Sequence, residues 1–142
     1  MNLFRKIVKC PVESFGSKVL GSIFWPPVSV AVLAEGDHDD FLVLDADSHY
    51  ELPGGIVKRG EDLRDAAQRE FKEESGFKGD LGELLDIKTS KTGIHFFFKG
   101  RVLEGEKNGS WEGRPEFVKR EDMSDKAWRL EHSHVHQYLF PD

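Results

Sequence analysis

The 142-residue chain has a single cysteine, Cys10, and no apolar run long enough to cross a membrane. One cysteine cannot form a disulfide within the chain, so we expect a protein of the reducing cytoplasm. Residues 1–16 include basic side chains but lack the continuous apolar core and small-residue cleavage site of a secretory signal. The absence of repeats and low-complexity tracts excludes a collagen-like or disordered protein.

Positive charge is also in short supply, because 20 Lys and Arg stand against 26 Asp and Glu, giving a net charge of −6. This balance argues against a partner that is a nucleic acid or an anionic membrane. An anionic small ligand would need a bound cation to offset the repulsion. Hydrophobic residues make up 38% of the chain, which is enough for one core. We therefore expect a single domain over 1–142, in which 1–24 forms an N-terminal strand or arm.

Short β-branched and aromatic runs separated by turn residues predict a protein in which strands outnumber helices. A loop is predicted after Pro53-Gly54-Gly55, and then a helix over 61–75 with Gly76 as its C-terminal cap. A second helix is predicted from an N-cap at Ser124 to Leu139. Two helices of this kind need a sheet to pack against, so the fold class is α/β or α+β, in layers. The predicted strands are 28–34, 41–44, 83–89, 94–103 and 116–118.

The helix predicted over 61–75 breaks the rules of an amphipathic helix. At 100° per residue, Glu70 and Glu74 lie on the stripe that Leu63 begins as an apolar, inward-facing surface. The two carboxylates repel each other at i,i+4 and lie near the negative end of the helix dipole. Oxygen ligands around a hard cation, Mg²⁺ or Mn²⁺, would offset these costs. Glutamates that are simply solvated on a surface helix are the alternative.

Residues 55–77 also match a known pattern. Gly55 is followed after five residues by Glu61 and after seven more by Arg69-Glu70-Phe71-Lys72-Glu73-Glu74-Ser75-Gly76-Phe77. This segment resembles the Nudix box at every defined position, and Leu52-Pro53-Gly54 before it is typical of the same family. The resemblance implies an α/β/α sandwich with a mixed sheet, the box helix and a C-terminal helix. It also implies an enzyme in which water attacks the pyrophosphate linkage of a nucleoside diphosphate derivative, with Mg²⁺ or Mn²⁺ as cofactor.

The resemblance further implies which residues bind metal. Glu73 and Glu74 match ligand positions, and Glu70 matches either a third ligand or the general base. The carbonyl group of Gly54 matches a backbone ligand. Many members of the family add a carboxylate from well after the box, for which Glu116 fits better than Glu112; a solvated acid is the alternative reading for either. The expected metal ligands are therefore Gly54, Glu70, Glu73, Glu74 and Glu116.

Other positions of the box match supporting roles. Arg69 matches an arginine that orients the glutamates, so the residues expected in catalysis are Glu70, Glu73 and Arg69. Glu61, which the helical wheel puts away from the glutamates, matches a structural position, as do Gly55 and Gly76. A homodimer is a further expectation of the family.

The substrate is less well defined by the sequence. Subfamilies that cleave ADP-ribose have a proline about sixteen residues beyond the box, where this chain has Thr92 and Gly93. The tyrosine of dinucleoside-polyphosphate hydrolases is also missing there, and no segment resembles the coenzyme A group. A small-molecule nucleoside triphosphate or related nucleotide is therefore expected by elimination. The alternatives are a module that senses a nucleotide without cleaving it, a nucleotide-sugar or ADP-ribose hydrolase, and an enzyme acting on RNA 5′ ends.

Three histidines near the C-terminus have the spacing of metal ligands, since His132 and His136 lie at i,i+4 with His134 between them. No cysteine or further histidine accompanies them in the sequence, so we do not expect a zinc site there. Cys10 is expected to be a small buried hydrophobe rather than a nucleophile.

Overall fold

The computed structural model describes residues 26–108, 113–125, 128, 132 and 135–139. Its sheet is mixed, because β1 pairs in parallel with β6 whereas the other pairings between the named strands are antiparallel. The strand order is β3-β2-β1-β6-β5, with β4 paired to β1 and β7 paired to β2. The elements are β1 (Val28–Glu35), β2 (Asp40–Asp45), β3 (Tyr50–Glu51), β4 (Gly54–Ile56), α3 (Leu63–Ser75), β5 (Phe77–Ser90), β6 (Gly93–Gly105), β7 (Arg114–Lys119), the 3-10 helix η1 (Arg120–Asp125) and α4 (His136–Leu139).

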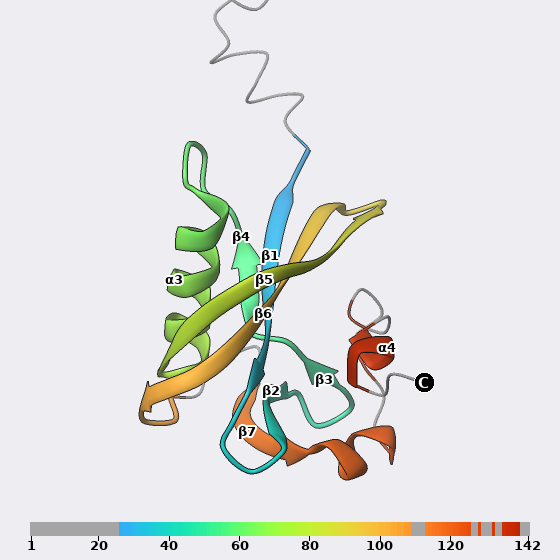
Figure 1. Ribbon diagram of the computed structural model, residues 1–142. Helices are drawn as coiled ribbons and strands as arrows, with labels where there is room; N and C mark the ends of the chain where they lie inside the picture. The colour runs from blue at the N-terminus through green and yellow to red at the C-terminus, as the bar shows by residue number, and fades with distance from the viewer. Residues whose placement is uncertain (1–25, 109–112, 126–127, 129–131, 133–134, 140–142) are drawn as a thin grey trace, which may run out of the picture.

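Helices cover both faces of this sheet, as Figure 1 shows with α3 on one side and α4 on the other. Alternate side chains of the central strand β1 point to opposite faces of the sheet, one covered by α3 and the other by α4. Val30 and Val32 pack toward Phe71 of α3, and Leu33 packs toward Leu139 of α4. Burial on both faces explains why β1 is an almost continuous apolar run. The α/β/α sandwich with a mixed sheet is confirmed.

The sheet divides along β1. The first half of this strand, Ser29–Ala31, pairs with β4, whereas Ala34 and Glu35 pair with β2. At the division, the N–H of Val32 donates to the carbonyl oxygen of Pro53 at 2.9 Å. The strands that diverge there leave a pocket beside Gly54 and Gly55.

Gly54–Ile56 forms β4, a strand that was not predicted, so the loop expected after Pro53-Gly54-Gly55 begins only after Ile56. Strand propensity is low for glycine, but the close approach of β4 to β1 requires it. A Cβ atom on Gly54 would lie 2.1 Å from the carbonyl oxygen of Val30. The helix also begins later than predicted, at Leu63, because Asp62 is its N-cap and accepts hydrogen bonds from the next turn.

The strands predicted over 83–89 and 94–103 exist but are longer, since β5 and β6 form a hairpin from Phe77 to Gly105. At the C-terminal end, the predicted start of a helix at Ser124 was wrong. Ser124 lies within η1, and α4 begins only at His136. Cys10, Glu112, His134 and the predicted N-terminal strand or arm lie outside the described residues. Within the described residues, no helix has the length and apolar character needed to cross a membrane.

Candidate active site

Helix α3 is fixed in place by its caps and by its buried face. The Asp62 side chain accepts from the N–H groups of Arg64 and Asp65, and Gly76 ends the helix with a left-handed φ of 81°. Ala66, Ala67 and Phe71 are fully buried against the sheet. Because these residues fix the rotation of the helix about its axis, the carboxylates of Glu70 and Glu74 face strand β4.

Two of these carboxylates lie against the two glycines of β4. Glu74 is only 7% exposed, and its Oε2 accepts a hydrogen bond from the N–H of Gly54 at 2.8 Å. Glu70 lies so close to the next residue that a Cβ atom on Gly55 would be 2.5 Å from its Cδ. Gly55 therefore lets the backbone approach the Glu70 carboxylate, and a larger residue there would displace it.

Arg69 connects the remaining acids. Its guanidinium donates to both carboxylate oxygens of Glu61, at 2.8 and 3.0 Å, and to the carbonyl oxygen of Ile56 at 3.1 Å. A third nitrogen, Nη1, lies 2.5 Å from Glu70 and 3.3 Å from Glu73, whose side chain is 59% exposed. Although the helical wheel puts Glu61 away from the glutamates, it precedes the helix and reaches the cluster through Arg69.

These contacts shift two ionisation equilibria. The hydrogen bonds from Arg69, followed by the N–H of Lys58, lower the pKa of Glu61 from 4.5 to about 2. The hydrogen bonds that Arg69 donates to Glu61, together with the one it donates to Glu70, raise the pKa of Arg69 above its ordinary value. Both groups are therefore charged over the whole range in which the protein is expected to work.

The donor set of this cluster fits Mg²⁺ or Mn²⁺. Carboxylate and carbonyl oxygens are hard ligands, and the position of a guanidinium between Glu70 and Glu73 shows that these acids attract a cation. Among the described residues, no three acidic, histidine or cysteine side chains converge closely enough to hold an ion by themselves. Since Mg²⁺ usually takes one or two protein carboxylates and completes its shell with water and phosphate oxygens, the residues suit an ion shared with a substrate.

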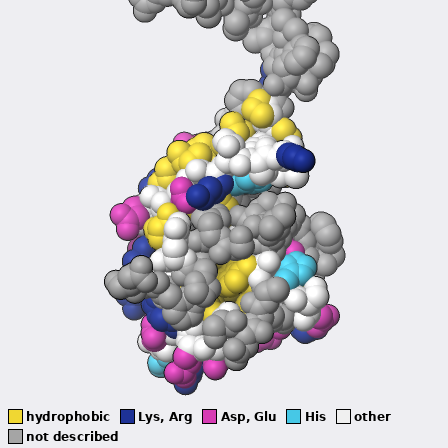
Figure 2. All heavy atoms as spheres, turned by 90° about the vertical axis from the view of Figure 1, so that its right-hand side faces the viewer, with side chains coloured by type: hydrophobic (Ala, Val, Ile, Leu, Met, Phe, Trp, Pro, Cys, Tyr) yellow, Lys and Arg dark blue, Asp and Glu magenta, His cyan; other side chains and the backbone are white. Residues whose placement is uncertain are grey.

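The pocket at the division of the sheet lies on the other side of the same glycines. Gly54 and Gly55 line it together with Glu51, Ser29, His95 and His132, and no Lys or Arg of the described residues does so. Figure 2 shows the side of the molecule that carries α4, where histidine side chains reach the surface. The described lining therefore mixes polar groups with apolar side chains such as Leu52 and Ile56, and it contains no Lys or Arg.

Hydrogen bonds fix the polar groups of this pocket. The Nδ1 atom of His95 lies 2.6 Å from the hydroxyl oxygen of Ser29, and its Nε2 atom lies 2.8 Å from that of Ser90. Glu51 is bonded to His49 at 2.7 Å. Sequence reasoning missed Ser29 and His95. The available signal was their position within apolar strands, at places where the alternation directs side chains inward.

Glu116 lies on β7, where its carboxylate forms an ion pair with Lys107 at 2.7 Å. Its neighbour Phe117 packs on the side of α3, whereas Val118 packs on the side of α4. Because successive residues of a strand point to opposite faces, Glu116 leaves the strand on the side away from the box helix. Its role as a metal ligand stays a prediction.

The comparisons with known proteins agree with this geometry. The family model described as "NUDIX domain" matches residues 25–139. A comparison with curated protein sequences returned no match. Crystal structures of other proteins share the fold. A NUDIX hydrolase from Nitrosomonas europaea has a TM-score of 0.70 at 21% identity, over 80% of this chain and 70% of that one.

A MutT protein from Bacillus halodurans has a TM-score of 0.62 at 20% identity, over 82% of this chain and 84% of that one. An ADP-ribose pyrophosphatase from Streptococcus suis has a TM-score of 0.64 at 21% identity, over 80% of this chain and 87% of that one. At these sequence identities the structural similarity shows a shared fold only. Membership of the family is shown by the family model, which covers most of the chain. The chain belongs to the Nudix hydrolase family.

Proposed function

We propose that this chain hydrolyses the pyrophosphate linkage of a nucleoside triphosphate or a related nucleoside diphosphate derivative and requires Mg²⁺ or Mn²⁺. The observation that carries the proposal is the strand β4, whose glycines Gly54 and Gly55 have the box carboxylates Glu74 and Glu70 on one side and a pocket on the other. A substrate in this pocket would lie across a strand only three residues long from the acidic cluster.

The chemistry of the pocket supports its use for the nucleoside. Imidazole, hydroxyl and carboxylate groups line it with no Lys or Arg among the described residues, so it suits hydrogen bonding to an uncharged base or ribose better than binding of phosphate. The pyrophosphate group would then lie toward Gly54 and Gly55. A divalent ion held there by Glu73, Glu74 and the Gly54 carbonyl group would offset the phosphate charge and polarise the phosphorus centre.

Glu70 is the best-placed general base. Glu70 is the box carboxylate that lies against Gly55, and Gly55 lines the pocket. A hydrogen bond from Arg69 holds the Glu70 carboxylate in its orientation. In the proposed reaction, a water oxygen forms a bond to one phosphorus and the bridging P–O bond breaks. The proton of the water passes to Glu70, and the released phosphate or nucleotide carries away the electron pair of the broken bond.

The experiment that tests this function is a substrate panel. Nucleoside triphosphates, nucleotide sugars, ADP-ribose, dinucleoside polyphosphates and 5′-triphosphorylated RNA would each be incubated with the protein and Mg²⁺, with an EDTA arm as control. We expect turnover of a nucleoside triphosphate that EDTA abolishes. Weak turnover of ADP-ribose is expected because Thr92 and Gly93 replace the proline typical of that subfamily.

Other outcomes of the panel would overturn parts of the proposal. Turnover restricted to ADP-ribose, a nucleotide sugar or RNA would replace the substrate class. Binding of a nucleotide without turnover in any arm would favour a sensing module. Activity that survives EDTA would contradict the metal requirement. For the predicted ligand Glu116, Glu116→Gln should weaken Mn²⁺ binding, whereas the exposed Glu104→Gln on β6 should not.

A further inference from the structure

Three consecutive residues before the box are each held by a different part of the molecule. The N–H of Leu52 donates to Nδ1 of His132 at 3.0 Å. The carbonyl oxygen of Pro53 accepts from Val32 of β1 at 2.9 Å, and the N–H of Gly54 donates to Glu74 of α3 at 2.8 Å. The segment that connects β3 to β4 is therefore held by the sheet, by the box helix and by the C-terminal part of the chain.

The contact from His132 differs from the other two because it spans 80 residues of the sequence. The imidazole ring also packs edge to face on Phe97, with ring centroids 5.8 Å apart and an interplanar angle of 88°. Phe97 is buried in the core on the α4 side of the sheet. The core thus fixes the plane of the imidazole, and with it the direction from which Nδ1 meets the Leu52 N–H.

A ring nitrogen that accepts from a backbone N–H carries no proton. His132 is therefore in the tautomer with its proton on Nε2. If Nδ1 carried the proton, two hydrogen-bond donors, Nδ1–H and the Leu52 N–H, would face each other. Leu52 is 2% exposed, and the imidazole is the acceptor for its buried N–H. The hydrogen bond from Leu52 to His132 is consequently a specific restraint on this segment.

We propose that His132 is a positioning residue for the hydrolysis proposed above, on which this inference rests. By holding Leu52, it fixes the segment that carries the carbonyl group of Gly54 and the N–H that holds Glu74. Since His132 and Gly54 also line the same pocket, the C-terminal part of the chain connects substrate binding with the geometry of the acidic cluster. The C-terminal histidine that resembled a zinc ligand in the sequence thus acts through a backbone amide.

The test uses substitutions that keep or remove the acceptor at the position of Nδ1. His132→Asn keeps an oxygen close to that position, His132→Gln moves it farther along the side chain, and His132→Leu removes it. Binding of Mn²⁺ alone would be measured by electron paramagnetic resonance, and kcat and KM on the substrate found in the panel. We expect His132→Leu and His132→Gln to weaken Mn²⁺ binding and to lower kcat by roughly tenfold, which is the size of effect seen when an outer-shell partner of a metal site is replaced. His132→Asn should keep both Mn²⁺ affinity and kcat near the wild-type values. The exposed His38, replaced by Leu and by Asn, is the matched control.

A role in stability alone would give a different result. His132→Asn and His132→Leu would then lower Tm while Mn²⁺ affinity and kcat stayed at the wild-type values, which would overturn the proposal. If His132→Leu fails to fold, the ¹⁵N chemical shifts of the wild-type imidazole decide the question. An unprotonated Nδ1 and a Leu52 amide resonance that moves in His132→Asn are expected, and a protonated Nδ1 would contradict the proposal.

The Mn²⁺ and NMR measurements need no substrate. Failure of the proposed hydrolysis therefore leaves the positioning role testable, and failure of the positioning role leaves the hydrolysis intact.

Discussion

The guanidinium of Arg69 donates two hydrogen bonds to the carboxylate of Glu61, one to each oxygen. Glu61 lies before the N-cap of α3 and Arg69 lies in its middle, so the pair ties the entering loop to the helix. The same guanidinium contacts Glu70 and Glu73. One side chain thus sets both the path of the chain into the helix and the orientation of two acids.

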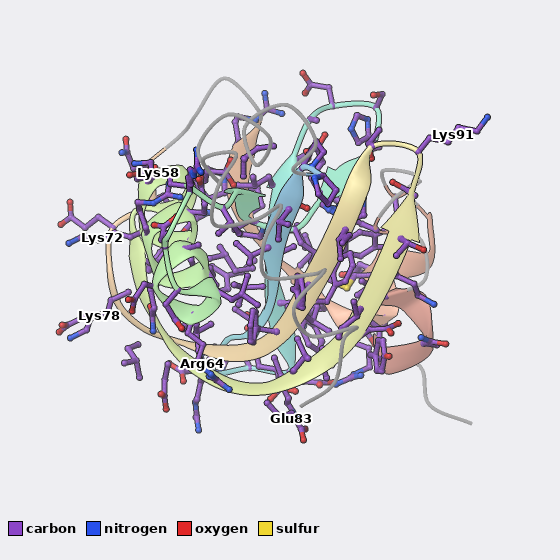
Figure 3. All side chains as sticks on the ribbon, turned by 90° about the horizontal axis from the view of Figure 1, so that it is seen from above. Lys58, Arg64, Lys72, Lys78, Glu83 and Lys91 are labelled. Atoms are coloured by element: carbon purple, nitrogen blue, oxygen red, sulfur yellow. The ribbon has the colours of Figure 1, made fainter. Side chains whose placement is uncertain are left out.

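Replacement of Arg69 by lysine should separate these functions. A single ammonium group cannot bond both oxygens of Glu61 and still reach Glu70, because it lacks the planar fork of the guanidinium. We expect Arg69→Lys to lower Tm and to reduce kcat/KM by at least about tenfold, as removal of outer-shell partners does. The reverse exchange at an exposed position of the same helix, Lys72→Arg, whose side chain points away from the sheet in Figure 3, should change neither.

The depressed pKa of Glu61 predicts a pH dependence of stability. Because the pKa is lower in the folded protein, at about 2, than the ordinary value of 4.5, the ion pair stabilises the fold fully above pH 4.5. This contribution is lost as the pH falls from about 4.5 toward 2. Glu61→Gln should therefore lower Tm at pH 7, and the difference from wild type should shrink over that acid range. A difference that stayed constant down to pH 2 would contradict the assignment.

Gly55 should not tolerate a side chain. In Gly55→Ala the new Cβ would meet the Glu70 carboxylate, which must move. Overpacking of this kind costs about 1 to 3 kcal/mol of stability, and we expect weaker Mn²⁺ binding with it. Gly82→Ala is the control, since its Cβ would lie 3.4 Å from the nearest atom, the carbonyl oxygen of Lys99, which is an ordinary van der Waals contact. Equal Mn²⁺ affinity in both variants would contradict the expectation that displacing Glu70 disturbs the metal site.

Glu73 offers the cleanest test of the metal assignment, because its exposed side chain contributes little to packing. Glu73→Gln should keep the wild-type Tm and reduce Mg²⁺-dependent hydrolysis by roughly 100-fold. Glu83→Gln removes an exposed carboxylate on β5, whose side chain points outward in Figure 3, and should keep full activity. Full activity in Glu73→Gln would remove this residue from the site.

Part of the candidate site could be predicted because its determinants are local. A helix periodicity of 3.6 residues puts Glu70 and Glu74 on one stripe whatever the rest of the fold, and the pattern from Gly55 to Phe77 identifies the family. The strands of the core could be predicted for the same reason, since runs such as 28–34 are apolar and β-branched. Strand β4 was not predicted, because the low strand propensity of its glycines is outweighed by a close approach that only the folded sheet creates.

The sequence by itself therefore determined the box helix, its acidic stripe and the membership of the family, all of which depend on residues close together along the chain. Only the tertiary structure decided which groups meet those acids. The contacts of Ser29 with His95 and of Leu52 with His132 join residues 66 and 80 positions apart. Such pairs follow from strand register and from the packing of the C-terminal segment, and no short-range pattern records either one.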